Sequence, residues 1–123
     1  MSNILVIDDD EAILSMLRLL LTELGHNVET AAEGKEGIQK IDENLFDLVI
    51  TDILMPGIDG NDVVQHIRNS DREFMPIIGI SGTPRLSKDN DFDTVIPKPY
   101  SIKTLVDTVN KLVATPSMEE SRG

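Results

Sequence analysis

With 123 residues, the chain is long enough for one domain with a single hydrophobic core and too short for two. Hydrophobic residues make up 40 % of it, which excludes a disordered chain, and a formal net charge of -11 argues against direct binding to nucleic acid or to an anionic membrane. The absence of cysteine excludes disulfides and thiol chemistry. No basic leader precedes the first predicted strand and no apolar run reaches bilayer-spanning length, so we expect a cytoplasmic domain.

Strand and helix patterns alternate along the chain. In chain order they predict a strand at 4–7, a helix at 13–24, a strand at 27–32, a helix at 38–45, a strand at 48–51, a helix at 60–67, strands at 77–80 and 94–96, and a helix at 102–113. Asp10, Asp59 and Ser101 stand where helix N-caps belong, and Gly25 stands where a C-cap belongs. This alternation predicts an α/β fold, with a doubly wound parallel sheet covered by helices on both sides.

One helix is missing from the alternation. Residues 82–93, between the fourth and fifth strands, contain Pro84 and only two large apolar side chains, whose spacing fits no helical face. We therefore predict that the fourth helix is short or absent. We assign residues 1–114 to the domain and residues 115–123, which are polar and contain Pro116, to a flexible C-terminal tail.

Charged and hydroxyl side chains follow the predicted strands at their carboxyl ends. Asp8 and Asp9 follow the first strand, Asp52 ends the third, Ser81 ends the fourth and Lys98 follows the fifth. In an open parallel sheet these ends share one edge, where ligands bind. Carboxylates brought together raise each other's pKa, and a divalent cation such as Mg²⁺, together with Lys98, would offset their repulsion. Such a site suits phosphoryl transfer to a carboxylate nucleophile.

Four segments make this pattern specific: 4–9, 47–60, 78–82 and 97–100. In this order, and each at a strand end, they resemble the receiver domains of two-component response regulators over residues 3–113. The resemblance implies a flavodoxin-like fold with five parallel strands in the order 2-1-3-4-5. It also implies a phosphorylation switch, driven by a histidine kinase or a histidine phosphotransfer protein and acting on a downstream protein or on an effector domain outside this chain.

The resemblance also implies the role of each site residue. Asp52 would accept the phosphoryl group from a phosphohistidine. Asp9, Asp52 and the backbone carbonyl of Leu54 would bind Mg²⁺ or Mn²⁺ directly, and Asp8 would act on the metal mainly through water. We therefore expect phosphorylation to depend on a divalent metal.

The remaining site residues include one departure from the family. Ser81 would hydrogen-bond the phosphoryl group, Lys98 would pair with it, and the Lys98–Pro99 bond resembles the family's cis peptide. Val95 stands where most receivers carry an aromatic residue that couples to the hydroxyl, and the segment between Ser81 and Lys98 is shorter than usual. We predict a working acceptor site with an altered relay, in which ordering of residues 82–93 on phosphorylation replaces the aromatic switch.

Three other functions are weighed against this one. Asp8 and Asp10 form an acid-x-acid pair, as in phosphohydrolases of the haloacid dehalogenase type, but Ala12 stands where that family expects Thr or Val. A flavin-binding carrier needs a phosphate-binding loop after the first strand, and three consecutive aspartates would repel phosphate. The third is a receiver kept as a docking surface without phosphorylation. We favour a signalling switch rather than an enzyme, with no direct contact to nucleic acid or membrane, and leave a weak homodimer open.

Overall fold

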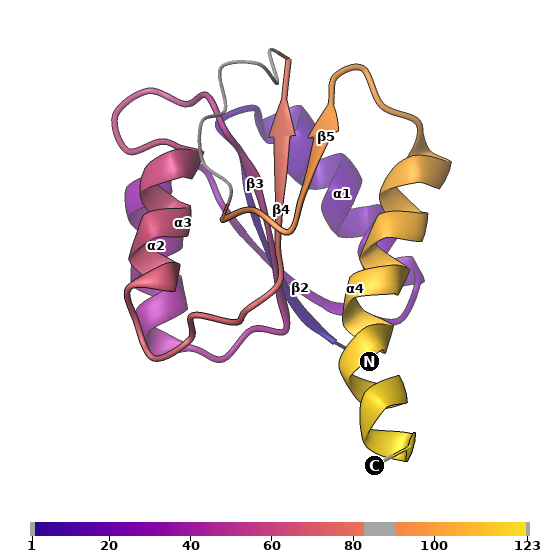
Figure 1. The fold of residues 1–123 in the computed structure, drawn as a ribbon. Helices are drawn as coiled ribbons and strands as arrows, with labels where there is room; N and C mark the ends of the chain where they lie inside the picture. Colours follow the sequence, from indigo (N-terminus) through magenta and orange to yellow (C-terminus); the bar gives the residue numbers. More distant parts are fainter. Residues whose placement is uncertain (1, 83–90, 123) are drawn as a thin grey trace.

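A five-stranded parallel sheet forms the centre of the molecule, with helices on both faces (Figure 1). The computed structural model describes residues 2–82 and 91–122, with side chains as far as Val113. The strands are β1 (Asn3–Ile7), β2 (Asn27–Ala31), β3 (Leu48–Asp52), β4 (Ile77–Ser81) and β5 (Thr94–Pro97). The helices in the described ranges are α1 (Glu11–Glu23), α2 (Gly34–Glu43), α3 (Gly60–Arg68) and α4 (Ile102–Arg122). The strand order is β2-β1-β3-β4-β5, so the predicted topology is confirmed.

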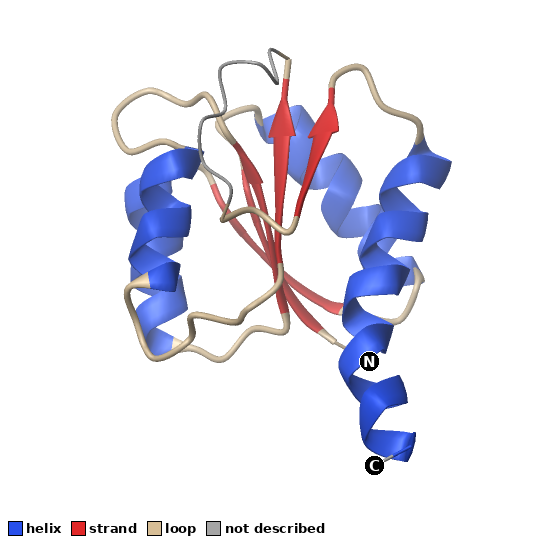
Figure 2. Ribbon diagram, in the orientation of Figure 1, coloured by secondary structure: helices blue, strands red, loops and turns tan. Residues whose placement is uncertain are grey.

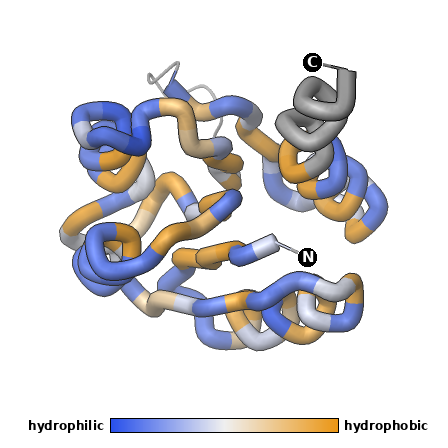
Figure 3. Tube along the Cα trace, turned by 90° about the horizontal axis from the view of Figure 1, so that it is seen from below, coloured by the Kyte–Doolittle hydropathy of each residue, from blue (hydrophilic) through white to orange (hydrophobic). Residues whose placement is uncertain are grey.

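Alternate residues of the central strands face opposite helix layers. In β1, Ile4 and Val6 join the core cluster that packs against α1 and α4, whereas Leu5 and Ile7 join the cluster that packs against α2 and α3. Figure 2 shows these helix pairs on opposite sides of the strands, and Figure 3 shows the central strands as mainly hydrophobic segments between the layers. Burial on both faces explains why β1 and β3 are continuous apolar runs in the sequence.

The helix ends follow the predicted capping pattern. The side chains of Asp10 and Asp59 each accept a backbone N–H in the first turn of α1 and α3, and the Ser101 hydroxyl does the same for α4. Gly25 follows α1 with φ 97°, a left-handed conformation that favours glycine. The four capping predictions are confirmed, and these caps set where each helix begins or ends relative to the sheet.

Gly60 determines how closely α3 packs on the end of β3. A Cβ atom at this position would lie 2.6 Å from the Asp52 carbonyl oxygen and 2.7 Å from the Ile53 Cα atom. The Gly60 N–H also donates to the Ile53 carbonyl at 2.9 Å. Because only glycine permits this approach, the first residue of α3 holds the backbone around Asp52 in place.

The second helix differs from its prediction at both ends. It begins at Gly34 and ends at Glu43, and Leu45, which we expected on its apolar face, is 75 % exposed. The backbone is already extended at the C-cap Asn44, so the chain leaves the helix there and Phe46 is buried in place of Leu45. The prediction therefore extended the apolar helical pattern of α2 two residues beyond the end of the helix at Glu43.

The last helix was predicted to end near residue 113, and this end is wrong, because the backbone of α4 stays helical to Arg122. The sequence beyond Pro116 includes Met118, Glu119 and Glu120, which have high helix propensity, whereas the prediction gave more weight to the proline. The flexibility of residues 115–123 stays a prediction. No helix of the described ranges combines the length and the apolar content needed to span a membrane.

The connection between β4 and β5 is described only at its ends. The predicted short or absent helix falls mainly on residues 83–90, which lie outside the described residues. At the far end, Arg68 donates to the Asp91 carbonyl through Nε at 2.9 Å and Nη2 at 2.6 Å. The neighbouring Phe92 is buried, and a Cβ at Gly79 would lie 2.9 Å from its ring. Arg68 and Phe92 therefore fix the path by which the chain returns to β5.

Candidate functional site

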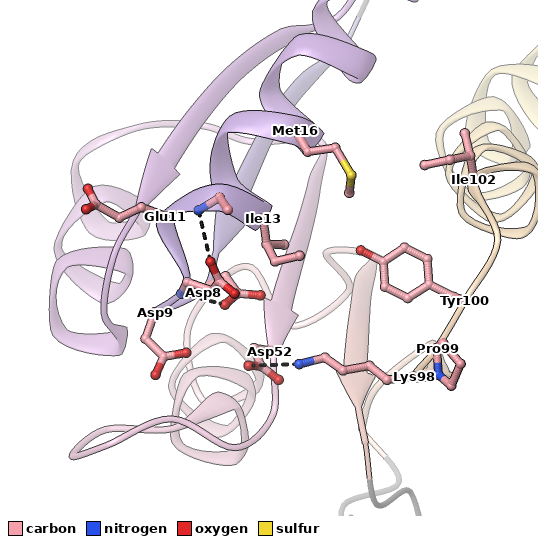
Figure 4. Close-up of a pocket in the computed structure, with 12 residues that line it drawn as sticks. Asp8, Asp9, Glu11, Ile13, Met16, Asp52, Lys98, Pro99, Tyr100 and Ile102 are labelled. Atoms are coloured by element: carbon pink, nitrogen blue, oxygen red, sulfur yellow. Dashed lines mark hydrogen bonds and ion pairs between the residues drawn. The ribbon is translucent and has the colours of Figure 1, made fainter.

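Three carboxylates meet at the carboxyl ends of β1 and β3 (Figure 4). Asp8 and Asp9 follow β1 directly, and Asp52 is the last residue of β3. Since β1 and β3 are parallel neighbours with Ile7 opposite Thr51, the next residues, Asp8 and Asp52, emerge side by side. One oxygen from each of the three carboxylates lies within 4.8 Å of the other two. The predicted convergence of the three aspartates is present in the structure.

Asp8 is the most deeply buried of the three, with 3 % of its surface exposed. Its Oδ1 accepts the Asp10 N–H at 2.9 Å, and its own N–H donates to the Ala31 carbonyl at 3.1 Å. Burial raises the Asp8 pKa to about 6; the Asp10 N–H opposes this rise, and the charge on Asp52 adds to it. Near neutral pH, Asp8 is therefore a carboxylate whose surroundings disfavour its charge.

Lys98 approaches the carboxylates from the end of β5. Its Nζ donates to Oδ2 of Asp52 at 3.4 Å. Burial raises the pKa of Asp52, the charge and hydrogen bond of Lys98 lower it, and the charge on Asp9 raises it again. The net direction for the Asp52 pKa is upward, so one ammonium group does not offset the combined effect of burial and a neighbouring carboxylate.

The Lys98–Pro99 peptide bond is cis, as the resemblance implied. The Lys98 N–H donates to the Ser81 carbonyl at 2.8 Å, and Ser81 itself is buried at the end of β4. In the β3–β4 ladder, Asp52 lies opposite Ile80, the residue before Ser81. The sheet thus brings Ser81 to the edge that carries the three carboxylates. Its hydrogen bond to a phosphoryl group stays a prediction.

Two further residues from the sequence analysis lie near this edge. Leu54 follows Asp52 by two residues in the β3–α3 loop, where its own side chain is exposed, and the metal contact of its carbonyl stays a prediction. Asp10 caps α1 by accepting the Ala12 N–H at 2.9 Å and is not part of the carboxylate cluster found among the described residues. Asp10 therefore has a structural role, which argues against the haloacid dehalogenase alternative.

A cleft of about 1070 Å³ opens onto the carboxylates, between the start of α1 and the β5–α4 connection. The side chains that line it beside the site residues include Ile13, Met16, Pro99, Tyr100 and Ile102. Tyr100 is the only tyrosine in the chain and stands two residues after Lys98. The sequence pattern gave it no role, because nothing in that pattern shows that its ring faces the cleft.

The donor set fits a hard divalent cation. Mg²⁺ prefers oxygen ligands and is commonly held by one or two carboxylates together with waters. Here three carboxylates share one edge, the pKa values of two of them are raised, and one lysine pairs with one of them. A cation among these oxygens would remove the repulsion that burial leaves uncompensated, so the residues present fit Mg²⁺ or Mn²⁺.

Solved structures of similar proteins share this fold. One is the response regulator TrrA from Thermotoga maritima in complex with Mg²⁺-BeF, 34 % identical, with a TM-score of 0.82 over 91 % of this chain and 99 % of that one. Another is the chemotaxis protein CheY4 of Vibrio cholerae, 30 % identical, with a TM-score of 0.83 over 91 % of this chain and 98 % of that one. The fold of this chain thus matches almost the whole of each of these two solved chains.

Sequence comparison leads to the same group of proteins. The transcriptional regulatory protein AfsQ1 of Streptomyces coelicolor is 40 % identical over 96 residues, which cover 78 % of this chain and 40 % of the relative. The response regulator MprA of a Mycobacterium species is 32 % identical over 122 residues, which cover 95 % of this chain and 53 % of the relative. The chain thus spans about half the length, or less, of these relatives. The model of the response regulator receiver domain matches residues 4–110. The chain belongs to the response regulator receiver domain family.

Proposed function

We propose that this domain is a phosphorylation switch of a two-component phosphorelay, in which Asp52 accepts a phosphoryl group from a phosphohistidine. The observation that carries the proposal is the meeting of Asp8, Asp9 and Asp52 at one sheet edge, with the Lys98 ammonium 3.4 Å from Asp52. Paired buried carboxylates without full compensation are costly and are expected at functional sites. The cleft that Asp52 lines gives a phosphoryl donor a path to its carboxylate, and the Lys98 ammonium supplies positive charge beside it.

The transfer follows from the chemistry of these groups. A carboxylate oxygen of Asp52 forms a bond to phosphorus as the phosphorus–nitrogen bond to the donor imidazole breaks, and the imidazole leaves with the electron pair of that bond. Lys98 lies where its charge can stabilise the phosphoryl oxygens, and Ser81 lies at the neighbouring strand end to hydrogen-bond one of them.

A divalent metal would be held by Asp9, Asp52 and the carbonyl of Leu54, with Asp8 acting through water. Mg²⁺ or Mn²⁺ bound there supplies positive charge that neutralises the transferring group. The buried Asp8 and the exposed Asp9 differ in what they contribute. Asp8 contributes a buried carboxylate whose charge its surroundings disfavour, and Asp9 presents an accessible ligand.

The partners follow from the same proposal. The phosphoryl donor would be a histidine kinase or a histidine phosphotransfer protein. The phosphorylated domain would then act on a downstream protein or on an effector domain. This chain covers only 40 % and 53 % of the relatives named above, and which protein or domain receives the signal stays part of the proposal. We propose a signalling role in the cytoplasm, with assistance of its own phosphorylation and hydrolysis but no turnover of a separate metabolite, and with no direct contact to nucleic acid or membrane.

Intact-mass spectrometry after incubation with acetyl phosphate tests the acceptor. We expect one phosphoryl group to be added in the presence of Mg²⁺ and none in the presence of EDTA. Asp52→Ala should abolish the adduct, whereas Asp71→Ala, which removes an exposed carboxylate in the turn before β4, should leave it unchanged. A wild-type protein that gains no mass with Mg²⁺, even after rapid quenching, would contradict the proposal and support the docking surface without phosphorylation.

A further inference from the structure

Two large apolar side chains are exposed to solvent at the amino-terminal end of the sheet. Phe74 and Leu45 are 89 % and 75 % exposed, the highest values among the large hydrophobic residues that the structure describes. Leu45 precedes β3 and Phe74 precedes β4, so both lie at the end of the parallel sheet opposite to Asp52, the last residue of β3. Figure 1 shows the two connections at this end, and Figure 3 views the molecule from it. A surface formed here is therefore separate from the acidic cleft.

Arg72 fixes the connection that carries Phe74 against the one that carries Leu45. Its Nη1 donates to the carbonyl oxygens of Ile41 and Asn44, the latter at 2.7 Å. Asn44 is the C-cap of α2 and directly precedes Leu45. The two exposed apolar residues thus come from segments that are hydrogen-bonded to each other. Single exposed apolar residues are common on proteins, but a pair on adjoining segments indicates an interaction site.

The backbone around Phe74 is held on both sides. Arg68 donates through Nη1 to the carbonyl oxygens of Glu73 and Met75, at 2.7 Å each. Met75 is buried in the core cluster that packs against α2 and α3, whereas Phe74 is exposed. Because the backbone that presents the Phe74 ring is already fixed, little conformational freedom is lost when a partner covers that ring.

A hollow of about 410 Å³ lies beside Leu45, at the amino ends of β1 and β2. Its wall combines the apolar side chains of Leu45 and Phe46 with the acidic side chains of Glu29 and Glu43. This composition suits a side chain that has an apolar stem and a cationic head, such as lysine or arginine.

The exposed charges around the apolar pair are mainly negative. Residues 42–47 and 69–75 contain five acidic side chains and one arginine, whose guanidinium already donates to carbonyl oxygens. The carboxylates of Glu43, Asp71 and Glu73 are exposed and have no ion-pair partner among the residues that the structure describes. A second copy of this chain would bring the same negative charges face to face, which disfavours self-association. The partner that complements this surface is positively charged.

We propose that Leu45 and Phe74, together with the acidic side chains around them, form a docking surface for a basic segment of a partner protein. Large apolar side chains of that segment cover Leu45 and Phe74, and its lysine or arginine side chains pair with the surrounding carboxylates. Because the surface lies at the opposite end of the sheet from Asp52, a bound segment leaves the acidic cleft open. The inference goes beyond the proposed function and does not depend on phosphorylation.

Fluorescence anisotropy with two labelled synthetic peptides tests the proposal on the full chain. Both peptides contain the same apolar residues, which are flanked by lysines in one peptide and by glutamates in the other. We expect the lysine-flanked peptide to bind and its affinity to fall as salt is raised, whereas the glutamate-flanked peptide should not bind. A lysine-flanked peptide that fails to bind at low salt would overturn the inference.

Replacing the apolar pair distinguishes docking from a general attraction between charges. Leu45→Ser combined with Phe74→Ser should raise the dissociation constant of the lysine-flanked peptide roughly tenfold or more, because two apolar anchors are lost. Leu19→Ser, at an exposed leucine of α1, should change it by less than about twofold. Urea unfolding should show all these variants to be folded, since the side chains replaced are exposed. Equal peptide affinity in the double variant and in wild type would contradict the docking surface.

Reversing the charge provides a second, independent test. Glu43→Lys combined with Glu73→Lys should weaken binding of the lysine-flanked peptide and strengthen binding of the glutamate-flanked peptide. An unchanged preference between the two peptides would show that the carboxylates of this surface do not contact the flanking charges, and it would overturn the proposed partner chemistry.

Two other occupants have distinct signatures. A wild-type dimer in sedimentation experiments that Phe74→Ser dissociates would assign the surface to a second copy of the chain and overturn the proposal of a basic partner. Peptide binding that is lost in Asp52→Ala would place the peptide in the acidic cleft, with the same consequence. Labelling by acetyl phosphate should be equal in wild type and in the Leu45→Ser, Phe74→Ser variant, so failure of this inference leaves the proposed phosphorylation switch standing.

Discussion

Replacing Asp8 with asparagine should make the metal-free protein more stable at neutral pH. Asparagine has nearly the same shape, and its Oδ1 can continue to accept the Asp10 N–H, which donates to Asp8 at 2.9 Å. The substitution removes a buried charge whose surroundings disfavour it. Because the Asp8 pKa rises from 3.8 to about 6 on folding, the folded protein binds this proton more tightly than the unfolded chain does.

The sign and size of the effect follow from that shift. Where the folded state binds more protons, stability falls as pH rises, so the cost of ionising Asp8 increases between about pH 4 and pH 7 and is then constant. A shift of about two pH units corresponds to about 3 kcal/mol as an upper value. Near pH 4 the cost falls below about 1 kcal/mol, because Asp8 is then largely protonated in the folded protein.

Urea denaturation in EDTA, at about pH 7.5 and about pH 4, measures this directly. Asp8→Asn should exceed wild type by up to about 3 kcal/mol at the higher pH, and the difference should shrink at the lower pH. Asp71→Asn, at an exposed carboxylate, should change stability by less than about 0.5 kcal/mol. Equal or lower stability of Asp8→Asn at the higher pH would refute the argument that Asp8 is a strained charge.

Three further predictions concern the backbone and the cation around the site. Gly60→Ala should destabilise the fold by about 1–3 kcal/mol and slow phosphorylation, because its Cβ would meet the Asp52 carbonyl at 2.6 Å; Gly82→Ala, where a Cβ meets nothing within 4 Å, is the control for stability in urea. Arg68→Ala should lower the unfolding free energy by about 1 kcal/mol, since it removes the donor to the exposed Glu73 carbonyl and the part-buried Met75 carbonyl, whereas Ala at the exposed Arg18 should have little effect. Lys98→Gln should slow acetyl phosphate labelling by roughly tenfold or more without unfolding the protein, and an unchanged rate would exclude Lys98 from phosphoryl binding.

The parts of the fold that could be predicted are those encoded by local pattern. The apolar runs of β1 and β3 leave little alternative to strands buried on both faces, and a parallel pair of such strands must bring Asp8 and Asp52 to one edge. Asp10 and Asp59 were predictable as caps, because their side chains bond to N–H groups two and three residues ahead. Predicting the acidic site therefore required only the positions of the strand ends and the types of residue found there.

The features that escaped prediction depend on contacts between distant segments. Leu45 and Phe46 are adjacent and both apolar, and only the packing of the core cluster that Phe46 joins decides that Phe46 is buried. Tyr100 lies in the matching segment 97–100, but its position at the cleft depends on how α1 and α4 pack on the sheet. The pKa of Asp8 likewise depends on burial by the finished fold, which no spacing in the sequence reveals.

The residue at Val95 raises the question of how a change at Asp52 reaches the surface of the domain. Val95 is opposite Gly79 in the β4–β5 ladder, and the space beside Gly79 is filled by the ring of Phe92 and the side chain of Ile53, each 2.9 Å from a Cβ placed there. Ile53 directly follows Asp52, and Ile53 and Phe92 belong to the same core cluster. An aromatic ring thus occupies the neighbourhood of the missing one, but it comes from the connection before β5. The altered relay stays a prediction, because most of residues 82–93, whose ordering would replace the aromatic switch, lie outside the described residues, whereas Phe92 at the end of this connection is buried in the core cluster that contains Ile53.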